Sequence, residues 1–352
     1  MKRLVFAFPG ELETPTGGYI YDRRIIEGLQ GLGWQVDLLS LGAGFPYPSA
    51  ETITHAATLL QAVPSGTLVV IDGLASGVLP EAVAALSRHH PVVALVHHPL
   101  AFETGVSPHQ AEAFRLSETR ALSHVKQVIV TGPSTARDLE QFFAVAPASI
   151  DVVRPGTARA ALAQGSGSET LHLVSVGSVT PRKGFDVLLA ALQPLSALPW
   201  TLTIAGDLMR DDKAPVQLAS DIERFGFQQR VRTLGAVNDT ALEALYQSAD
   251  VFVLASFFEG YGMAYAEALA RGLPVIGTTG GAIPDTVPQE AGVLVPPGDV
   301  QCLTQALRTV MQDKALRERL SQGAKRAAMQ QPTWEQTVQR FAEVLERLQT
   351  QS

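Results

Sequence analysis

The stretch SFFEGYGMAYAEALARGLPVIGTTGGAIPD, residues 256–285, decides the interpretation of this chain. It places Glu259 and Glu267 eight positions apart, on either side of a glycine-rich turn and the start of an alanine-rich segment of helical composition. Apolar strand patterns precede the stretch at 251–254 and recur within it at 274–277. One carboxylate therefore follows a strand, the other lies on the next helix, and the N–H groups of the helix N-terminus lie between them. This arrangement suits a ligand with an anionic diphosphate and several hydroxyls.

Short apolar runs recur along the chain with helical segments between them, which is typical of βαβ units whose parallel sheet is covered on both faces. A helix with an apolar stripe is expected over 19–32, and Ser134 is expected to cap the start of a later helix. The expected strands are 4–8, 36–41, 68–72, 92–97, 128–131, 152–153, 171–176, 202–205, 231–234, 251–254, 275–277 and 293–295.

A small, polar segment, ARAALAQGSGSET at 158–170, interrupts this alternation and has the composition of a linker. A chain of 352 residues is also too long for one ordinary core. We therefore expect an α/β fold with two Rossmann-like, doubly wound domains that face each other across a cleft, an N-terminal one over 1–157 and a C-terminal one over 171–333. Trp334 is expected to start a last amphipathic helix, 334–352, that packs back on the first domain.

Composition excludes several classes of protein. Hydrophobic residues make up 46% of the chain and charged residues 17%, as in a globular enzyme rather than a disordered chain. A net charge of −7 argues against nucleic acid as a main partner, and no apolar run reaches membrane-spanning length. The single cysteine, Cys302, excludes an intramolecular disulfide and favours the cytoplasm, with peripheral membrane association left open.

A basic turn follows the expected strand 171–176. The segment GSVTPRKG, residues 177–184, ends that strand and opens a helix, and it carries Arg182 and Lys183 side by side. Cations usually avoid helix N-termini because of the helix dipole, so their placement here favours a ligand, namely a diphosphate that they would stabilise as a leaving group. A solvated helix start is the alternative.

Two further candidates lie in the first half. Gly17 and Gly18 follow the first strand, where glycines allow a close backbone approach to a ligand or merely form a tight turn. His97 and His98 end another strand, where the crevice of a doubly wound sheet lies, so they either contact substrate or are structural.

Patterns that would define other cofactors are missing from the sequence. No G-x-G-x-x-G or Walker-type loop follows an expected strand, which disfavours a nicotinamide dehydrogenase. No Asp-x-Asp and no His or Cys metal spacing occurs, so neither a metal nor a cofactor is expected. Leu234, at the end of the strand 231–234, is assigned to the nucleotide, because such a strand end suits a flat base held through backbone contacts. Gly206, after 202–205, is assigned to the same donor-binding set.

Taken together, these residues resemble the retaining glycosyltransferases of family 4, which have the GT-B fold. The pattern of two glutamates in FFEGYGMAYAE looks like the hallmark of that family. The resemblance extends to ADVFVLAS before it, ARGLPVIGTTGGAIPD after it, VGSVTPRKGFDVLL upstream and GGY near the N-terminus. It covers nearly the whole chain and is denser in the second half.

The resemblance implies roles for individual residues. Glu259 would bind hydroxyls of the donor sugar, Glu267 the ribose, and Arg182 and Lys183 the diphosphate, while His97 matches a histidine near the donor sugar. The catalytic set that it implies is Lys183, Arg182, Glu259 and His97. The donor-binding set that it implies is Gly17, Gly18, Gly206, Leu234, Gly260, Tyr261, Gly262, Met263, Ala264 and Glu267.

Three positions depart from the family pattern. Ser178 stands where the family often has an arginine, and Arg182 would supply that charge from four positions on. His98 falls where an acidic residue is frequent, and Tyr261 where phenylalanine is usual. These departures leave Lys183 as the more secure of the two cations.

The resulting hypothesis is a retaining, metal-independent glycosyltransferase. It would move a sugar from a nucleotide-diphosphate donor, of UDP or GDP type, to a hydroxyl on a small molecule, lipid or glycan. The alternatives are a nucleotide-sugar epimerase of the same fold and a non-catalytic nucleotide-sugar-binding protein. The residues do not identify the sugar, the base, the acceptor or the oligomeric state.

Overall fold

The computed structural model describes residues 2–350 and divides the chain into two compact units. The first unit consists of Met1–Gly156 and Pro332–Ser352, and the second of Thr157–Gln331. Residue 1 and residues 351–352, where the expected first domain begins and the expected last helix ends, lie outside the described residues.

The first unit is built on a six-stranded sheet with the order β2-β1-β3-β4-β5-β6, in which every neighbouring pair is parallel. Its strands are β1 Arg3–Phe8, β2 Gln35–Ser40, β3 Leu68–Asp72, β4 Val92–Val96, β5 Gln127–Val130 and β6 Ile150–Val152. Its helices are α1 Gly17–Gly31, α2 Ala50–Gln61, α3 Gly73–Ser76, α4 Pro80–Leu86, α5 Pro108–Leu122, α6 Pro133–Phe142 and α14 Trp334–Thr350, with 3-10 turns η1 Leu100–Phe102 and η2 Pro147–Ser149.

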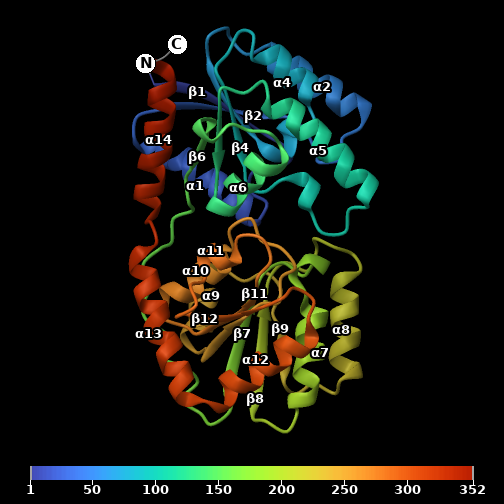
Figure 1. Cartoon of the computed structure of the whole chain (residues 1–352), viewed down its shortest axis with the longest axis vertical. Helices are drawn as coiled ribbons and strands as arrows, with labels where there is room; N and C mark the ends of the chain where they lie inside the picture. The colour runs from blue at the N-terminus through green and yellow to red at the C-terminus, as the bar shows by residue number, and fades with distance from the viewer. Residues whose placement is uncertain (1, 351–352) are drawn as a thin grey trace. The chain divides into compact units, whose positions relative to one another are not determined.

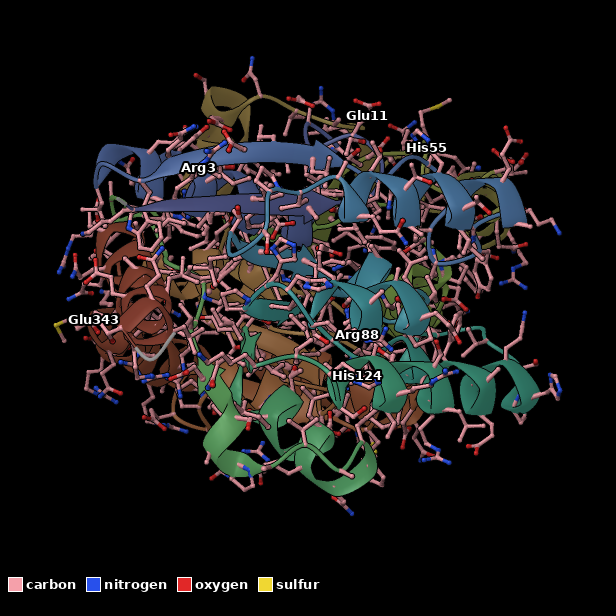
Figure 2. All side chains as sticks on the ribbon, turned by 90° about the horizontal axis from the view of Figure 1, so that it is seen from above. Arg3, Glu11, His55, Arg88, His124 and Glu343 are labelled. Atoms are coloured by element: carbon pink, nitrogen blue, oxygen red, sulfur yellow. The ribbon has the colours of Figure 1, made fainter. Side chains whose placement is uncertain are left out.

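Both faces of this sheet are covered, which explains its continuous apolar strands. Leu4 and Phe6 of β1 pack with α1 and α14, whereas Val5, on the opposite face, packs with α2 and α4. Figure 1 shows α14 running beside α1. The polar side chains labelled in Figure 2 are all exposed and lie on several elements of this unit: Arg3, Glu11, His55, Arg88, His124 and Glu343.

The C-terminal helix α14 belongs to the first unit, where it packs closely against α1. A Cβ atom added at Gly28 of α1 would lie 2.3 Å from a methyl carbon of Val338 on α14, so the close contact requires glycine at this position. Phe341 and Leu345 of α14 are fully buried in the same cluster as Ile25 of α1. Burial of each such side chain contributes about 1.5–3 kcal/mol.

The second unit repeats the plan with a parallel sheet of order β12-β11-β10-β7-β8-β9. Its strands are β7 Leu171–Val176, β8 Trp200–Ala205, β9 Val231–Thr233, β10 Val251–Val253, β11 Val275–Thr278 and β12 Gly292–Val295. Its helices are α7 Phe185–Leu192, α8 Ala214–Arg224, α9 Asp239–Gln247, α10 Met263–Ala270, α11 Ile283–Thr286, α12 Val300–Gln312 and α13 Lys314–Gln330, with 3-10 turns η3 Pro181–Lys183 and η4 Gln193–Leu195.

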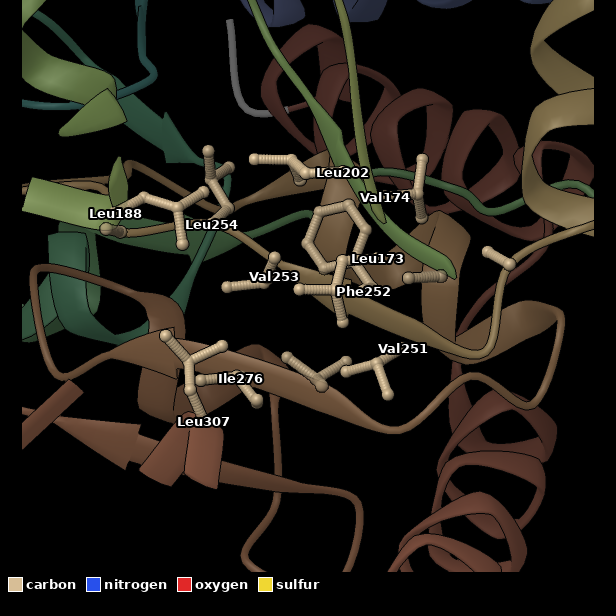
Figure 3. Close-up of a cluster of buried hydrophobic side chains, with 14 of the residues drawn as sticks. Leu173, Val174, Leu188, Leu202, Val251, Phe252, Val253, Leu254, Ile276 and Leu307 are labelled. Carbon is tan, nitrogen blue, oxygen red and sulfur yellow. The ribbon is translucent and has the colours of Figure 1, made fainter. Parts of the chain in front are cut away.

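The core of the second unit is centred on its middle strands. Figure 1 shows α7 and α8 on one side of the sheet and α10 and α13 on the other. In Figure 3 the ring of Phe252, on β10, lies among aliphatic side chains of neighbouring strands, including Leu173 and Val174 of β7. All three are fully buried. This packed sheet gives the loops at its carboxyl edge a rigid support.

The expected α/β fold with two doubly wound sheets is confirmed, and each expected strand is present with ends that shift by at most two residues. The cap expected at Ser134 is wrong. Helix α6 begins at Pro133 with Gly132 as its N-cap, and no side chain caps it. Pro133 fits the first turn because its missing N–H would have no helical partner, so Ser134 lies inside the helix.

The segment 158–170, expected as a linker, packs on the second unit. Ala163 N–H donates to Arg271 O at 2.9 Å, and Ser166 N–H donates to Asp250 Oδ1 at 3.1 Å. Its polar, glycine-rich composition is therefore used for loop hydrogen bonds along the amino edge of the sheet.

Candidate functional site

The loop between β10 and α10 is shaped by glycine. Gly262, the N-cap of α10, has φ +87°, in the left-handed region that side chains rarely adopt. A Cβ atom there would also lie 2.8 Å from the ring of Tyr265. No side chain caps α10, so the first-turn N–H groups that follow Gly262, at Met263 and Ala264, are placed to bind a ligand oxygen.

Glu259 lies at the centre of a charged cluster in this loop. Its Oε1 accepts hydrogen bonds from Lys183 Nζ at 2.5 Å and from Ser256 Oγ at 2.6 Å. Its Oε2 accepts one from Arg182 Nη1 at 3.0 Å. Glu259 is only 6% exposed, so the structure brings three residues of the predicted catalytic set together inside the second unit.

The two cations control the charge of Glu259. Burial alone would raise the pKa of its carboxyl, but the charges of Lys183 and Arg182, with the hydrogen bonds from Lys183 and Ser256, outweigh burial and lower the pKa to about 2. The cluster of one carboxylate and two cations therefore carries a net positive charge at neutral pH. Such a cluster suits an anionic ligand.

The basic turn is fixed against the glutamate loop by the backbone. Lys183 and Arg182 belong to η3, directly before α7, and Gly184 follows with φ +63°. A Cβ atom at Gly184 would lie 2.2 Å from Ala255 O, so only glycine lets the turn approach this closely. Phe257 N–H donates to Arg182 O at 2.8 Å, which ties the two segments together.

Glu267, on α10, belongs to a separate network. Tyr246 Oη donates to Glu267 Oε2 at 3.0 Å, and Arg271 Nη1 donates to the carbonyl oxygen of Glu267 at 2.8 Å. The Arg271 guanidinium also lies 4.4 Å from the centre of the Tyr246 ring. Burial raises the pKa of Glu267, and the Tyr246 hydroxyl and the Arg271 charge offset part of this effect. The Tyr246 hydroxyl thereby fixes one oxygen of the half-buried carboxylate.

The remaining donor-binding candidates of this unit lie at neighbouring strand ends. Gly206 follows β8, and a Cβ atom there would lie 1.9 Å from Gly177 O, so the ends of β7 and β8 come together only with glycine. Leu234 follows β9 and donates its N–H to Ile204 O at 2.9 Å. Gly260 and Tyr261 lie in the loop before α10, where Tyr261 O accepts a hydrogen bond of 2.5 Å from Thr286 Oγ1.

The first unit holds the other candidates, Gly17, Gly18 and His97. Both glycines lie in the first turn of α1, which Thr16 caps by accepting a hydrogen bond from Tyr19 N–H. A Cβ atom at Gly18 would lie 3.2 Å from the His97 ring, so the start of α1 and the end of β4 are adjacent.

Around His97 the structure places two buried acids. His97 Nε2 lies 3.1 Å from Asp22 Oδ1 and 3.5 Å from Asp72 Oδ2. Among residues 2–350, these are the one set of three or more histidine, cysteine or acidic side chains whose ligand atoms all lie within 4.8 Å of one another. The charge pairing of the ring with the acids accounts for that proximity, so we assign no metal here. His98 contacts Glu103 instead, with 2.9 Å between Nε2 and Oε2.

Residues of these networks that were not predicted from the sequence include Ser256, Tyr246, Asp22 and Asp72. Ser256 precedes Glu259 by three positions, and Asp72 ends a strand as His97 does, so both residues could have been predicted from their positions in the sequence. Tyr246 and Asp22 lie within helices and meet their partners only through tertiary packing.

A cavity of about 760 Å³ lies elsewhere in the second unit. Its lining includes Leu171, Pro199 and Pro274, at the amino ends of the strands, together with Lys314 and Arg317 of α13. None of the predicted site residues lines it. The candidate site is instead defined by the loops at the carboxyl edge, as expected for ligand sites in open parallel sheets.

The second unit matches a known family. Residues 163–327 match the model described as glycosyl transferases group 1. Over 322 residues the chain is 27% identical to the MMP alpha-(1->4)-mannosyltransferase of Mycolicibacterium hassiacum, with 87% of this chain and 76% of that protein covered. It is 30% identical to the D-inositol 3-phosphate glycosyltransferase of Jonesia denitrificans over 66% of this chain, but it spans only 59% of that protein.

Solved structures show the same fold. The sucrose-phosphate synthase of Thermosynechococcus elongatus aligns with a TM-score of 0.84 at 20% identity, over 99% of this chain and 100% of that one. Anabaena HepE, in complex with UDP and glucose, aligns with a TM-score of 0.73 at 19% identity, over 97% and 99%. The fold is therefore GT-B.

The class that this chain is similar to, by its fold and by the match over residues 163–327, is the GT-B glycosyltransferases of group 1. Within that class the chain is similar to transferases whose names specify mannose and inositol phosphate. Among the described residues, every helix is too short or too polar to cross a bilayer.

Proposed function

We propose that this chain is a retaining glycosyltransferase of family 4 that moves a sugar from a nucleotide-diphosphate donor to a hydroxyl acceptor. The observation that carries the proposal is the contact of Lys183 and Arg182 with Glu259 beside the uncapped N-terminus of α10. It combines a positive site for a diphosphate with a carboxylate that accepts hydrogen bonds from sugar hydroxyls.

The positive charge has a direct role in the reaction. In the oxocarbenium-like transition state, negative charge grows on the departing diphosphate. Lys183, Arg182 and the N-terminus of α10 would stabilise it in place of a metal ion, which is why we propose a metal-independent reaction. A guanidinium has five N–H donors and an ammonium three, so both cations have the capacity to bind phosphate while they contact Glu259.

The two glutamates would bind opposite ends of the donor. Glu259 is ionised and buried, and it would accept hydrogen bonds from the transferred sugar. Glu267 would accept hydrogen bonds from the ribose hydroxyls of a UDP-type or GDP-type donor, with the carboxylate held by Tyr246. No residue here is required as a nucleophile, because the acceptor hydroxyl would attack on the face that the diphosphate leaves.

The relatives support the choice of acceptor. One of their names specifies D-inositol 3-phosphate, which carries several hydroxyls, so we propose a hydroxyl of a small molecule, lipid or glycan as the acceptor. We propose the cytoplasm as the compartment, since Cys302 is a free, exposed thiol. Peripheral contact with a membrane stays compatible with this proposal.

The direct test is a transfer reaction with UDP- and GDP-sugars and polyol acceptors, followed by NMR of the anomeric proton. We expect a product with the anomeric configuration of the donor. An inverted product would contradict the retaining reaction. Donor interconverted in the absence of acceptor would instead identify an epimerase, and tight donor binding with no turnover would identify a binding protein.

A further inference from the structure

The chain enters the second unit through a segment whose backbone is bonded to the ends of two helices. We call residues 161–165, near the start of this unit, the entry segment. Ala163 N–H donates to Arg271 O, at the end of α10, at 2.9 Å. Gln164 N–H and the next N–H donate to Gln247 O, at the end of α9, at 2.9 and 3.1 Å. The last carbonyl groups of a helix have no partner within it, so the entry segment supplies donors that both helix ends need.

The side chains at the same two helix ends form one hydrogen-bonded network. Gln247 Nε2 donates to Ala161 O at 2.8 Å and to Glu243 Oε1 at 2.9 Å. Glu243 Oε2 accepts hydrogen bonds from Arg271, from Nε at 3.0 Å and from Nη2 at 2.5 Å. Glu243 therefore joins Gln247, which holds both ends of the entry segment, to Arg271.

Arg271 also contacts the residues that position the Glu267 carboxylate. Its Nη1 donates to Glu267 O at 2.8 Å, and its guanidinium lies 4.4 Å from the centre of the Tyr246 ring. The Tyr246 hydroxyl in turn donates to Glu267 Oε2 at 3.0 Å. The Arg271 side chain is 12% exposed and Tyr246 is fully buried, so water competes little with these contacts. One planar guanidinium thus contacts Glu243, the backbone of α10 and the ring that holds the Glu267 carboxylate.

The entry segment and Glu267 lie at different edges of the sheet. The segment includes lining residues of the cavity at the amino ends of the strands, whereas Glu267 belongs to the candidate site at the carboxyl edge. The path of the segment is restricted at Gly165, which has φ +78° and where a Cβ atom would lie 2.7 Å from Asp250 Oδ1. A ligand that fixes the Glu267 carboxylate therefore also restricts Tyr246, and through the guanidinium it restricts the entry segment.

We propose that Arg271 is a positioning residue that couples Glu267 to the entry segment, so that a nucleoside diphosphate bound at Glu267 strengthens the hydrogen bonds that hold the segment. The ligand rests on the proposed function, whereas the network does not. Coupling of this kind is reciprocal, so a well-held entry segment strengthens binding of the nucleotide by the same factor. Binding at the carboxyl edge is thereby linked to the place where the chain enters the unit.

The test is amide hydrogen exchange of the full chain by NMR, with and without saturating UDP or GDP, at the N–H groups of residues 163–165. In the wild type, we expect the diphosphate to slow their exchange by about fivefold or more. In Arg271→Lys, we expect faster exchange without ligand and little slowing with it, because lysine has no fork to contact Glu243, Glu267 and the Tyr246 ring together. Equal slowing in both proteins would overturn the proposal, as would a wild type in which exchange does not respond to bound diphosphate.

A matched control separates coupling from general stabilisation of the fold by a ligand. Leu316 N–H, near the start of α13, donates to Asp313 Oδ1 at 2.8 Å rather than to the network. The neighbouring Lys314 lines the same cavity as the entry segment. We expect exchange at Leu316 to be the same with and without diphosphate. Slowing at Leu316 equal to that at residues 163–165 would overturn the coupling in favour of a general effect.

Nucleotide affinity and turnover provide a second readout. Arg271→Lys should weaken binding of the diphosphate by about 3–10-fold and leave kcat at saturating donor within about twofold. Gln247→Ala should weaken binding in the same direction, although its side chain donates to Ala161 and Glu243 rather than to Glu267. Circular dichroism identifies which variants are folded. Unchanged affinity in both folded variants would overturn the coupling, and so would a loss confined to kcat.

Failure of the proposed function is a separate outcome. If neither UDP nor GDP bound the wild type, the proposed function would be contradicted, and the nucleotide part of the coupling with it. Exchange without ligand would still decide the structural part, because Arg271→Lys should speed exchange at residues 163–165 and not at Leu316. Binding with normal coupling but no sugar transfer would contradict the proposed reaction and support the role of Arg271.

Discussion

The two units of this molecule contain charge clusters of opposite composition. In the second unit one buried carboxylate, Glu259, lies between two cations, Lys183 and Arg182. In the first unit one imidazole, His97, lies between two buried carboxylates, Asp22 and Asp72. The surplus charge is positive in the first of these clusters, whereas burial raises the pKa of Asp22 to about 7 in the other, so the His97 cluster has no surplus positive charge. The same sheet architecture thus carries a cationic cluster at one loop edge and a cluster of one imidazole and two carboxyl groups at another.

The largest effect is expected at the positive cluster. Lys183→Ala should lower kcat by about 10²–10³, because it removes a charge that stabilises the departing diphosphate. The matched control is Lys314→Ala, since the side chain of Lys314 is 81% exposed and lies on α13. Steady-state kinetics of both variants measure the difference. A loss of less than threefold in Lys183→Ala would remove Lys183 from the catalytic set.

Substitutions of the two glutamates should affect different steps, one the binding of the nucleotide and the other the turnover of the donor. Glu267→Ala should weaken binding of a free nucleoside diphosphate by about 10–100-fold, the equivalent of about 1.5–3 kcal/mol for hydrogen bonds to a charged group. Glu259→Ala should retain that binding but lose turnover, because the cations remain and the contact with the sugar is lost. Isothermal titration and kinetics with both variants measure this. The reverse pattern would exchange the two assigned roles.

A smaller effect is expected from the support of Glu267. Tyr246→Phe removes the hydroxyl that donates to Glu267 Oε2, and a hydrogen bond of this kind contributes about 0.5–1.5 kcal/mol. We expect a rise in KM for the donor of about 2–10-fold with little change in kcat. If kcat fell instead and KM stayed constant, Tyr246 would act on the chemical step rather than on ribose binding.

The smallest effect concerns the stability of the fold. The stability contributed by the two clusters depends on pH in opposite directions. The pKa of Glu259 is lowered from 4.5 to about 2, so its contribution is present above pH 4.5 and is lost as pH falls toward 2. The pKa of His97 is raised from 6.5 to about 10, so its contribution is present below pH 6.5 and is lost as pH rises toward 10.

Thermal unfolding across pH tests this difference with two neutral variants. The gap in Tm between wild type and Glu259→Gln should close in acid, and the gap between wild type and His97→Gln should close in base. Gaps that stay constant over both ranges would mean that neither charge contributes to folding.

The second unit was the more predictable of the two. Its strands are short apolar runs, and the candidate residues Glu259, Lys183 and Gly262 lie in the connections that follow β7 and β10, so their positions could be inferred from the order of elements. The contact of Lys183 with Glu259 joins residues 76 positions apart, and the sequence predicted only that both would bind one donor, Lys183 at its diphosphate and Glu259 at its sugar. That the carboxylate itself is the partner of the cations follows from the close approach at Gly184.

The first unit was less predictable because its cluster is a product of tertiary packing. Asp22 lies on the buried face of α1 and meets His97 75 positions away, and no local pattern marks an aspartate in such a stripe. The cap expected at Ser134 failed because α6 begins at Pro133, so a residue with good capping propensity lies two positions after the N-cap, Gly132. Local chemistry predicted which strand ends carry the candidate residues, whereas the contacts made by helix faces required the structure.

The central claim is that the positive cluster of the second unit binds a nucleoside diphosphate. Isothermal titration of the full chain with UDP, GDP and the matching nucleosides tests it most directly. We predict that one diphosphate binds with micromolar affinity, that its nucleoside binds at least tenfold more weakly, and that Lys183→Ala loses most of this difference. Equal affinity for diphosphate and nucleoside, or full affinity in Lys183→Ala, would contradict the account.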